Sequence, residues 1–405
     1  MRITHISTFD RQGGAAIAAH RLHEALRREG VDSSMLVLHA SGEEEHIDSV
    51  MESRGDYLAY KVGTALDERT VRFIKKKGAG SFSLARFGSN IAAHPRIREA
   101  DVIQLHWLQG GYVSLSGLKR LFDLKKPVIW TMHDMWPFTG GCHYSGGCTG
   151  YTGDCPDCPM LKDRFAGMTK GVLAKKRKIY QGARLFPVGC STWLADIAAE
   201  STVFQGIETR ALPNPIDTEA YKPMDKAAAR KNLGLSPDGT YILFGAASPG
   251  IKRKGFTYLT EALKQIEDRC QLLVYGTDAM PEAAGLHIKA LGTLDSEGLR
   301  NAYGAADVFV VPSLEDNLPN TVMEAMACGV PVAAFDAGGI SDMIEHTRTG
   351  YLAEIRSGED LARGIHWCLA HKEELGASTR QKVEENYAYI AAARNYIRLY
   401  EEVLS

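Results

Sequence analysis

The feature that most constrains the fold of this chain is a regular alternation of short apolar runs with longer helical segments. Most of the runs are largely apolar, which is typical of strands that a parallel sheet buries on both faces. They occur at residues 3–8, 34–38, 102–105, 128–132 and 185–189, and again at 241–246, 271–275, 287–291, 308–311 and 330–335. Because parallel strands need a crossover connection, usually a helix, the chain is predicted to be an α/β protein.

A proline-containing break separates the two series of strands. Leu212-Pro213-Asn214-Pro215-Ile216-Asp217 carries two prolines, and a polar run follows it, as is typical of a linker. With 405 residues the chain is long enough for two or three domains of roughly 150 each. We therefore expect one domain at 1–215 and another at 216–385, with a cleft between their strand ends. The last helix, at 386–405, has no strand after it and must dock elsewhere.

Composition argues against several classes of protein. The formal net charge is −2, with 45% hydrophobic and 24% charged residues, so nothing global points to nucleic acid. No apolar run approaches the roughly 20 residues of a membrane span. The first residues read as a strand and have no signal-peptide core. The expected location is the cytoplasm.

The stretch from Pro312 to Gly329 carries the strongest functional signal. The strand at 308–311 runs into a polar turn that opens a helix, with Asp316 before the helix and Glu324 inside it. A strand end that meets a helix start is where α/β proteins bind phosphorylated ligands, and carboxylates suit sugar hydroxyls. Asn317 is expected to cap the helix. The alternative is that Asp316 only complements the helix dipole and Glu324 is a solvated residue.

At these residues the chain resembles the GT-B retaining glycosyltransferases of family four, which include many bacterial polysaccharide enzymes. Glu324-Ala325-Met326-Ala327-Cys328-Gly329 matches the second half of the family signature, which is a Glu, then seven intervening residues, then Glu-Ala-Met-Ala-Cys-Gly. Asp316 stands at the first Glu, and Glu315 is adjacent if the loop register differs. Other segments also resemble the family: Gly13-Gly14, Leu212 to Asp217, Lys254-Gly255, Ala337-Gly338-Gly339 and Thr349-Gly350.

The resemblance implies two Rossmann-like domains that face a central cleft, with the last helix crossing back to the first domain. It also implies that Glu324 holds the ribose hydroxyls of a nucleotide-sugar, that Asp316 binds hydroxyls of the donor sugar, and that Lys254 stabilises the leaving diphosphate. The family often has an arginine at the position of Ser248, so Arg253 or Lys252 is expected to supply the second positive charge. The remaining donor-binding residues implied are Gly13, Gly14, Asn317, Leu318, Pro319 and Asn320.

A histidine at the end of a first-domain strand is a further candidate. His133 follows the strand at 128–132, where the family tends to place a histidine that reaches the donor sugar. Asp134 is expected to orient its imidazole. His106-Trp107, also after a strand, is a weaker candidate for the acceptor side. The alternative is that these histidines are only satisfied polar residues.

Four of the eight cysteines crowd into a glycine-rich loop at about 140–160. Their pattern is Cys142-x5-Cys148-x6-Cys155-x2-Cys158. A C-x-x-C pair with two more nearby thiols is a credible tetrahedral zinc arrangement, although the spacing departs from the commonest zinc ribbons. Unliganded thiols and disulfides stay open as alternatives, the latter disfavoured by a cytoplasmic setting. The expectation is a possible structural zinc ion and no cofactor for catalysis.

Residues from about 40 to 100 are less informative. Arg72 to Gly78 mixes basic and apolar residues, and Phe82, Leu84 and Phe87 follow. This stretch is either a solvated helix end and loop or a contact with a membrane surface or an anionic acceptor.

The predicted function is sugar transfer, without a divalent metal and with retention, from a nucleotide-diphosphate sugar to an acceptor hydroxyl. The acceptor is expected to be a glycan or lipid-linked glycan of a cell-surface polysaccharide, so the protein could act at the inner face of the cell membrane. The alternatives are a GT-B nucleotide-sugar epimerase and a non-catalytic binding or interaction protein. Product analysis separates the first two, because only a transferase makes a glycoside.

Overall fold

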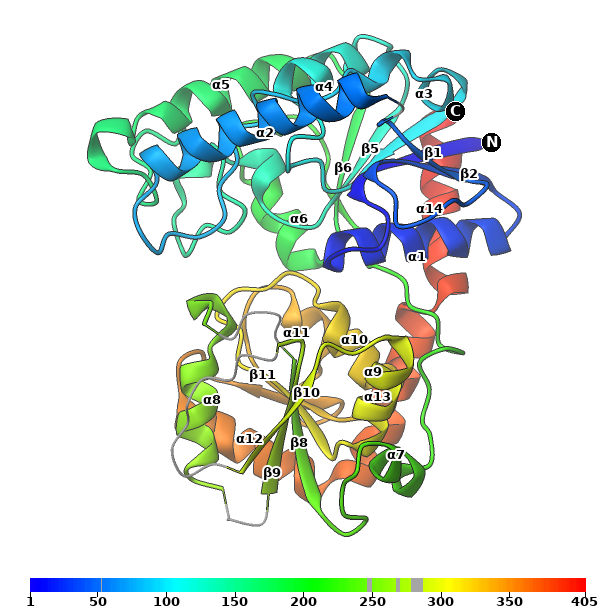
Figure 1. The fold of residues 1–405 in the computed structure, drawn as a ribbon, viewed down its shortest axis with the longest axis vertical. Helices are drawn as coiled ribbons and strands as arrows, with labels where there is room; N and C mark the ends of the chain where they lie inside the picture. The colour runs from blue at the N-terminus through cyan, green and yellow to red at the C-terminus, as the bar shows by residue number, and fades with distance from the viewer. Residues whose placement is uncertain (52, 246–249, 267–269, 278–286) are drawn as a thin grey trace. The chain divides into compact units, whose positions relative to one another are not determined.

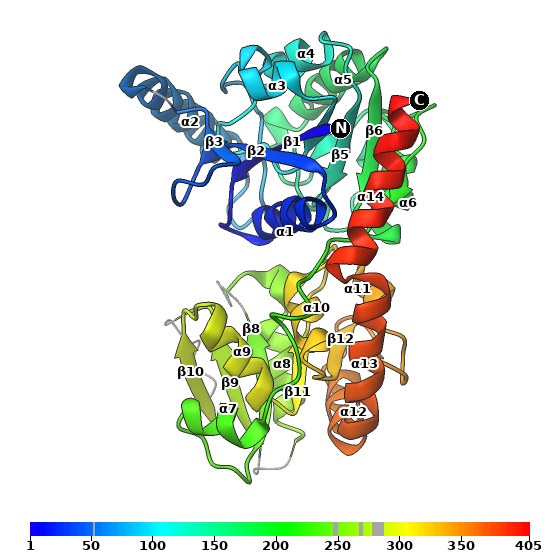
Figure 2. The same cartoon turned by 90° about the vertical axis from the view of Figure 1, so that its right-hand side faces the viewer.

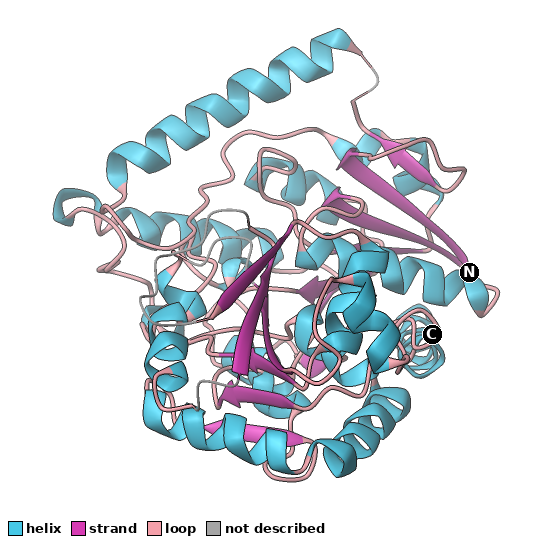
Figure 3. Cartoon of the chain, turned by 60° about the horizontal axis from the view of Figure 1, so that its bottom comes forward, coloured by secondary structure: helices cyan, strands magenta, loops and turns pink. Residues whose placement is uncertain are grey.

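The computed structural model describes residues 1–51, 53–245, 250–266, 270–277 and 287–405, which form two compact units (Figure 1). Unit 1 contains Met1–Pro215 and Ala392–Ser405, and unit 2 contains Ile216–Ala391. Each unit has a parallel sheet among helices, so the predicted α/β class is confirmed; Figure 3 shows the strands inside a surround of helices. Within the described ranges, no helix has the length and apolar character needed to cross a bilayer.

The sheet of unit 1 has seven strands in the order β3-β2-β1-β4-β5-β6-β7, all paired in parallel. The chain order reverses between β1 and β4, and such a switch point is where open α/β sheets bind ligands, beyond the carboxyl ends of the strands. The strands are β1 (Arg2–Phe9), β2 (Asp32–His39), β3 (Ile47–Ser49), β4 (Val102–Leu105), β5 (Val128–Met132), β6 (Leu185–Gly189) and β7 (Arg210–Ala211).

Helices cover the two faces of this sheet because neighbouring strand residues point in opposite directions. Ile6, Leu105 and Trp130 belong to one core together with residues of the helices α3, α4 and α5. On the opposite face, Ala19 of α1 packs on Met35 and Val37. The helices of unit 1 are α1 (Gly14–Arg28), α2 (Arg54–Ile74), α3 (Pro95–Glu99), α4 (Leu115–Phe122), α5 (Met168–Tyr180) and α6 (Thr192–Ala199), with short 3₁₀ turns at Ile91–Ala93, Trp136–Phe138, Gly150–Thr152 and Asp163–Phe165.

The last helix, α14 (Tyr389–Leu404), contributes its residues from Ala392 onward to unit 1. Tyr396 hydroxyl lies 3.2 Å from Thr131 Oγ1, and Tyr400 donates to Gln104 Oε1, so two buried tyrosines attach the helix to β4 and β5. Figure 2 shows α14 as the red helix that ends at the C-terminus. At its outer end Glu402 accepts two hydrogen bonds from Arg210, each 2.6 Å long.

Helix α2 is the largest element that the sequence prediction missed, since the prediction left 40–100 without regular structure apart from a helix end. A capping box was the available signal: Ser53 Oγ accepts from Asp56 N, and the Asp56 carboxylate accepts from Ser53 N. Of its 21 residues only Gly63 and Ile74 are buried. Such a helix lacks the wide apolar stripe that marks a core-facing helix in a sequence.

The sheet of unit 2 has six parallel strands in the order β10-β9-β8-β11-β12-β13, with its switch point between β8 and β11. The strands are β8 (Thr240–Gly245), β9 (Cys270–Tyr275), β10 (Ile288–Gly292), β11 (Val308–Val311), β12 (Val332–Phe335) and β13 (Gly350–Ala353). The helices are α7 (Lys226–Asn232), α8 (Phe256–Leu263), α9 (Ser296–Ala305), α10 (Asn320–Ala327), α11 (Ile340–Met343), α12 (Gly358–Ala370) and α13 (Lys372–Asn386). The 3₁₀ turn η5 (Lys252–Lys254) lies between β8 and α8.

A buried carboxylate joins several elements of unit 2. Asp307, directly before β11, has a fully buried side chain. Its Oδ1 atom lies 3.0 Å from Lys226 Nζ and 2.9 Å from Lys372 Nζ, and its Oδ2 atom lies 2.8 Å from Arg230 Nη2. Tyr241 N donates to the same Oδ2 atom at 2.9 Å. One side chain therefore connects α7, β8, β11 and α13.

Candidate active site

The turns after β8 and β11 pack against each other at the switch point of unit 2. Gly255, which follows η5, has a φ of 67°, and a Cβ built there would lie only 1.7 Å from the Pro312 carbonyl oxygen. Only glycine fits this approach of two backbones. The contact is held by a hydrogen bond of 2.8 Å from Leu314 N to the Arg253 carbonyl oxygen. The basic turn at η5 and the acidic turn after β11 are thus brought together.

Asp316 and Lys254 form an ion pair in this arrangement. Lys254 Nζ donates to Asp316 Oδ2 at 2.7 Å, and Arg253 Nη1 lies 3.3 Å from the same oxygen. Asp316 is only 7% exposed. Burial raises the pKa of its carboxyl, but the nearby charges of Lys254 and Arg253 and a hydrogen bond from Asn317 N outweigh burial and lower it. Asp316 is therefore an ionised carboxylate, within reach of two cations.

The backbone behind Asp316 is also held closely. Gly339 N donates to the Asp316 carbonyl oxygen at 3.0 Å, and a Cβ built at Gly338 would lie 1.9 Å from that oxygen. The neighbouring Glu315 contacts Arg253 through its backbone, since its carbonyl oxygen accepts a hydrogen bond from Arg253 Nη1. In the described part of the chain, Asp316 is the acid that both cations contact. Ser248 lies outside the described residues.

The start of α10 differs from the prediction that Asn317 is the cap. The helix begins at Asn320, Pro319 holds the N-cap position, and no side chain caps it. Asn317 is 2% exposed, and Leu318 is 6% exposed. Since proline fixes its own φ and lacks an N–H, it suits a helix entrance where no donor is needed.

Glu324 is buried in α10, so the alternative of a solvated helix residue is wrong. It is 5% exposed, and its Oε2 atom accepts a hydrogen bond of 2.9 Å from the Tyr303 hydroxyl. The Tyr303 hydroxyl lies 2.8 Å from that of Tyr275. Burial raises the pKa of Tyr303 well above its usual range, so this hydroxyl keeps its proton at neutral pH. Tyr303 and Tyr275 were not predicted, because their contact with Glu324 depends on the packing of α9, α10 and β9.

The predicted residues of unit 1 lie at its own switch point. Gly13, with a φ of 89°, is the exposed N-cap of α1, and Gly14 begins that helix. His133 is half-buried after β5, and the Asp134 carboxylate, which was predicted to orient it, hydrogen-bonds His143 and Trp107. His133 Nε2 lies 3.0 Å from His106 Nδ1 instead, and His106 is itself 3% exposed. His106 is therefore placed behind His133 in the interior.

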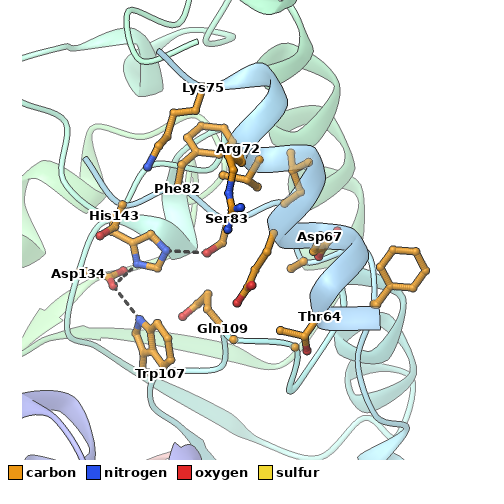
Figure 4. Close-up of a pocket in the computed structure, with 18 of the residues that line it drawn as sticks. Thr64, Asp67, Arg72, Lys75, Phe82, Ser83, Trp107, Gln109, Asp134 and His143 are labelled. Atoms are coloured by element: carbon orange, nitrogen blue, oxygen red, sulfur yellow. Dashed lines mark hydrogen bonds and ion pairs between the residues drawn. The ribbon is translucent and has the colours of Figure 1, made fainter. Parts of the chain in front are cut away.

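A cavity of about 600 Å³ opens beside this region of unit 1 (Figure 4). Asp134 is part of its wall: Asp134 Oδ2 lies 2.6 Å from His143 Nδ1 and accepts from Trp107 Nε1 at 3.1 Å. His143 Nε2 lies 2.9 Å from Ser83 Oγ. Burial raises the pKa of Asp134, but His143 and the hydrogen bonds lower it overall. Helix α2 forms the opposite wall with Thr64, Asp67, Glu68, Val71, Arg72 and Lys75.

This pocket combines the groups that recognise saccharides. The Trp107 indole offers an apolar face, Gln109 and Ser83 offer hydrogen-bonding groups, and Arg72 and Lys75 offer positive charge. The sequence prediction named Asp134 and Trp107 but missed Ser83, His143 and Gln109. His143 had no local signal except its place beside Cys142 in the cysteine loop.

The four loop cysteines surround one small cavity. Cys142, Cys148, Cys155 and Cys158 all line a space of about 20 Å³, and all four are free thiols. Burial raises the pKa of Cys142 to about 12. Within the described ranges, no three His, Cys, Asp or Glu side chains are grouped so that they could hold a metal ion. The thiols are thus neighbours that are not arranged as a finished metal site.

Family models match both units of the chain. The model "Glycosyltransferase Family 4" matches residues 12–220, and the model "Glycosyl transferases group 1" matches residues 239–371. A D-inositol 3-phosphate glycosyltransferase of Geodermatophilus obscurus is 32% identical over 194 residues, 43% of either chain, so the match spans under half of that relative. The putative colanic acid biosynthesis glycosyl transferase WcaC of Escherichia coli is 23% identical over 82% of this chain and 83% of its own.

Solved structures share the architecture of the whole chain. Sucrose-phosphate synthase from Thermosynechococcus elongatus has a TM-score of 0.68 at 20% identity, covering 99% of this chain and 98% of its own. HepE of Anabaena, in complex with UDP-glucose, has a TM-score of 0.68 at 16% identity, covering 99% and 100%. At these identities the likeness concerns the fold.

Proposed function

This chain belongs to Glycosyltransferase Family 4 and has the GT-B fold of two Rossmann-like domains, and from that premise we propose that it moves a sugar from a nucleotide-diphosphate sugar to an acceptor hydroxyl, with retention at the anomeric carbon. The observation that carries the proposal is the buried Asp316 carboxylate in contact with Lys254 and Arg253 where β8 and β11 end. Cations at such a switch point suit a diphosphate, and an ionised acid beside them suits sugar hydroxyls.

In the proposed reaction the bond from C1 of the sugar to the diphosphate oxygen breaks, and the acceptor oxygen bonds to C1 on the same face. The acceptor hydroxyl proton goes to the leaving phosphate, so no protein base is needed. Lys254 and Arg253 stabilise the charge that develops on the leaving oxygen, which is electrostatic catalysis without a divalent ion. Asp316 binds hydroxyls of the donor sugar, and Glu324 binds the ribose hydroxyls. In the free protein Lys254 is paired with Asp316, so the donor must replace part of that contact.

A thermal-shift panel of UDP-, GDP-, ADP- and TDP-sugars, with chelator present, tests the donor proposal. A ligand that binds only the folded state stabilises it by about 2.7 kcal/mol at a hundredfold excess over Kd, so one nucleotide class should raise the melting temperature. Glu324→Ala should abolish the rise, because the ribose hydroxyls lose their charged acceptor.

The quantity to compare is the ligand-induced rise in each variant, since Glu324 is buried and its loss also lowers the melting temperature of the free protein. Glu297→Ala, an exposed glutamate on α9, is the matched control and should keep the rise. A rise of unchanged size in Glu324→Ala would contradict the ribose role. Absence of any rise with every donor would contradict the donor class.

We propose that the pocket beside α2 receives the acceptor, a lipid-linked glycan of a surface polysaccharide. The relative WcaC is named for colanic acid biosynthesis. One side of α2 lines the pocket, while Leu58, Val62 and Leu66 are exposed by 64%, 53% and 46%. Their spacing of four residues puts them on one helix face, and the basic residues Arg72, Lys75, Lys76 and Lys77 follow. An apolar stripe with basic neighbours suits an anionic membrane surface.

Co-sedimentation with vesicles tests this contact. We expect binding to phosphatidylglycerol vesicles and little binding to phosphatidylcholine vesicles. The triple variant Leu58→Ser, Val62→Ser, Leu66→Ser should lose most of the binding, because each lost side chain removes about 1 kcal/mol or more of apolar burial. Ile355→Ser, at an exposed apolar residue of unit 2, is the control. Equal binding by the triple variant, or transfer to lipid-linked and free acceptors at equal rates, would contradict the proposal.

We also propose a structural zinc ion at the cysteine loop. The support is a buried amine: Lys176 is fully buried, and burial lowers its pKa to about 7 although Cys142, Asp134 and Cys155 act to raise it. A lysine is rarely buried without negative charge nearby, and a zinc ion with four thiolates would supply it. Thiolates suit zinc, and the space of about 20 Å³ is the size of one small ion or water. The loop would have to close until each sulfur reaches about 2.3 Å from the metal.

Elemental analysis of the purified protein should find about one zinc per chain, bound by the four thiolates. Cys155→Ser should remove the metal and lower the melting temperature, because the metal links separate parts of the loop. Cys270→Ser, at a lone half-buried cysteine of β9, should keep the metal. Metal-free wild-type protein with four titratable loop thiols would contradict the proposal.

A further inference from the structure

Three histidines form a hydrogen-bonded row in unit 1, which we call the histidine column: His5 lies in β1, and His106 and His133 directly follow the strands β4 and β5. His5 Nδ1 lies 3.0 Å from His106 Nε2, and His106 Nδ1 lies 3.0 Å from His133 Nε2. Both ring pairs are stacked, with centroids 5.3 Å apart. The column runs from the interior, where His5 is fully buried, to the half-buried His133.

The register of the sheet explains this row. His5 pairs with Gln104, two residues before His106, and by the register of β4 with β5 Thr131 stands opposite His106, two residues before His133. Side chains two residues apart share a face of the sheet, so all three histidines lie on one face. From each strand to the next, the histidine lies two residues closer to the carboxyl end. Adjacent strands lie about 4.8 Å apart, which suits stacked rings.

The two nitrogen–nitrogen contacts couple the proton positions of the three rings. A hydrogen bond between two imidazoles needs one N–H and one lone pair, and a neutral imidazole has one of each. A neutral column therefore has two arrangements that keep both bonds. In the first, every Nδ1 carries the proton and His133 presents Nδ1–H. In the second, every Nε2 carries it and His133 presents a lone pair at Nδ1.

The buried end of the column distinguishes the two arrangements. His5 Nε2 has no hydrogen-bond partner among the described residues. The second arrangement would leave an N–H there without an acceptor, whereas the first leaves a lone pair, and buried N–H groups without partners are the rarer case. Burial lowers the pKa of His5 to about 3 and that of His133 to about 4, so neutral rings are expected at neutral pH. Cys190 Sγ, 4.0 Å from His133 Nδ1, is both a weak donor and a weak acceptor and favours neither.

We propose that the histidine column holds His133 as the neutral tautomer with its proton on Nδ1, so that this N–H is a fixed hydrogen-bond donor for an oxygen atom of the bound sugar nucleotide. The identity of the ligand rests on the proposed function, but the tautomer does not. His106 is a positioning residue, because it acts through His133. In this state His133 cannot accept a proton at Nδ1, so it orients the donor sugar and does not act as a general base.

The tautomer can be read directly by ¹⁵N–¹H correlation spectra of histidine-labelled protein at neutral pH, with His133→Gln used to assign the signal. We expect a protonated, pyrrole-type Nδ1 and a pyridine-type Nε2 for His133. His106→Asn should keep this pattern, because its amide N–H can take the place of His106 Nδ1–H. His106→Leu should lose it, because the donor at His106 Nδ1 is then removed.

Kinetics give a second readout. A neutral hydrogen bond contributes about 0.5–1.5 kcal/mol, so His106→Leu should raise the KM for the donor by about 2–10-fold with little change in kcat. His106→Asn should have a KM for the donor close to that of the wild type. A His133 signal of the Nε2–H form, an averaged signal, or an unchanged tautomer in His106→Leu would overturn the proposal. The spectra need no turnover, so a protein that transfers no sugar would refute the proposed function and leave the tautomer measurable.

Discussion

Lys254→Met should lower kcat for sugar transfer by roughly 10²–10³-fold, the usual loss when one preorganised donor to a developing negative charge is removed. Lys254 Nζ is the cation closest to Asp316, at 2.7 Å, and the tight contact of Gly255 with Pro312 holds its turn in place. The leaving diphosphate gains charge as the bond to C1 breaks, so the effect should fall on kcat more than on KM. Single-turnover transfer with the donor identified by thermal shift measures it.

Lys252→Met is the matched control for this variant. Lys252 belongs to the same 3₁₀ turn but is exposed, so the substitution removes the same charge from nearly the same place. It should change kcat by less than about threefold, because an exposed charge is screened by water and salt. Equal losses in both variants would mean that only the general positive field of the turn matters, and would contradict a specific role for Lys254.

Asp307→Asn should lower the stability of unit 2 by about 3–5 kcal/mol, the usual cost of removing one partner of a buried ion pair. Arg230 has a side chain only 8% exposed, so its charge would stay in the interior without a counter-charge. For a unit of this size the loss corresponds to a decrease of roughly 10 °C in melting temperature. Differential scanning calorimetry measures it, and Glu359→Ala, which removes an exposed partner of Arg363, should leave the curve unchanged.

The dependence of this stabilisation on pH has a definite sign. Burial raises the pKa of Asp307, but the bond from Tyr241 N and the charges of Lys226 and Lys372 outweigh burial and lower it. A carboxyl with a depressed pKa stabilises the folded state above its unfolded pKa and loses that contribution as pH falls through the folded value. The difference in the free energy of unfolding between wild type and Asp307→Asn should therefore be largest at neutral pH. It should shrink as the pH falls below the ordinary Asp pKa of 3.8. A free-energy difference that is the same at acid and neutral pH would contradict stabilisation by the Asp307 charge.

The fold class could be predicted from the sequence because a parallel strand that is buried on both faces appears in the sequence as a short, largely apolar run. The acids of the signature, Asp316 and Glu324, could be named from their place at a strand end and from the family resemblance. Helix α2 was missed, because only Gly63 and Ile74 of its 21 residues are buried and it lacks the wide apolar face of a core-facing helix. The prediction that Asn317 is the N-cap of α10 was wrong, because Pro319 holds that position.

Which residues contact each other was harder to predict from the sequence than which residues are candidates for the site. Asp134 was expected to hold His133, its neighbour in sequence, but it contacts His143 and Trp107. His133 instead contacts His106, the residue that directly follows the adjacent strand β4. Adjacent strand residues point to opposite faces, so the residue next along the chain is the one least able to share a face. The same holds for Tyr303, which reaches Glu324 from a different helix.

The sequence by itself therefore determined the class of fold, the break between the two series of strands and the acids and cations of the candidate site, because these depend on patterns within a few neighbouring residues. Only the tertiary structure decided which groups pair: Lys254 with Asp316, His106 with His133, and Asp307 with three cations from α7 and α13. The physical reason is that strand order and register, set by the packing of the whole sheet, bring together residues that are far apart in the chain.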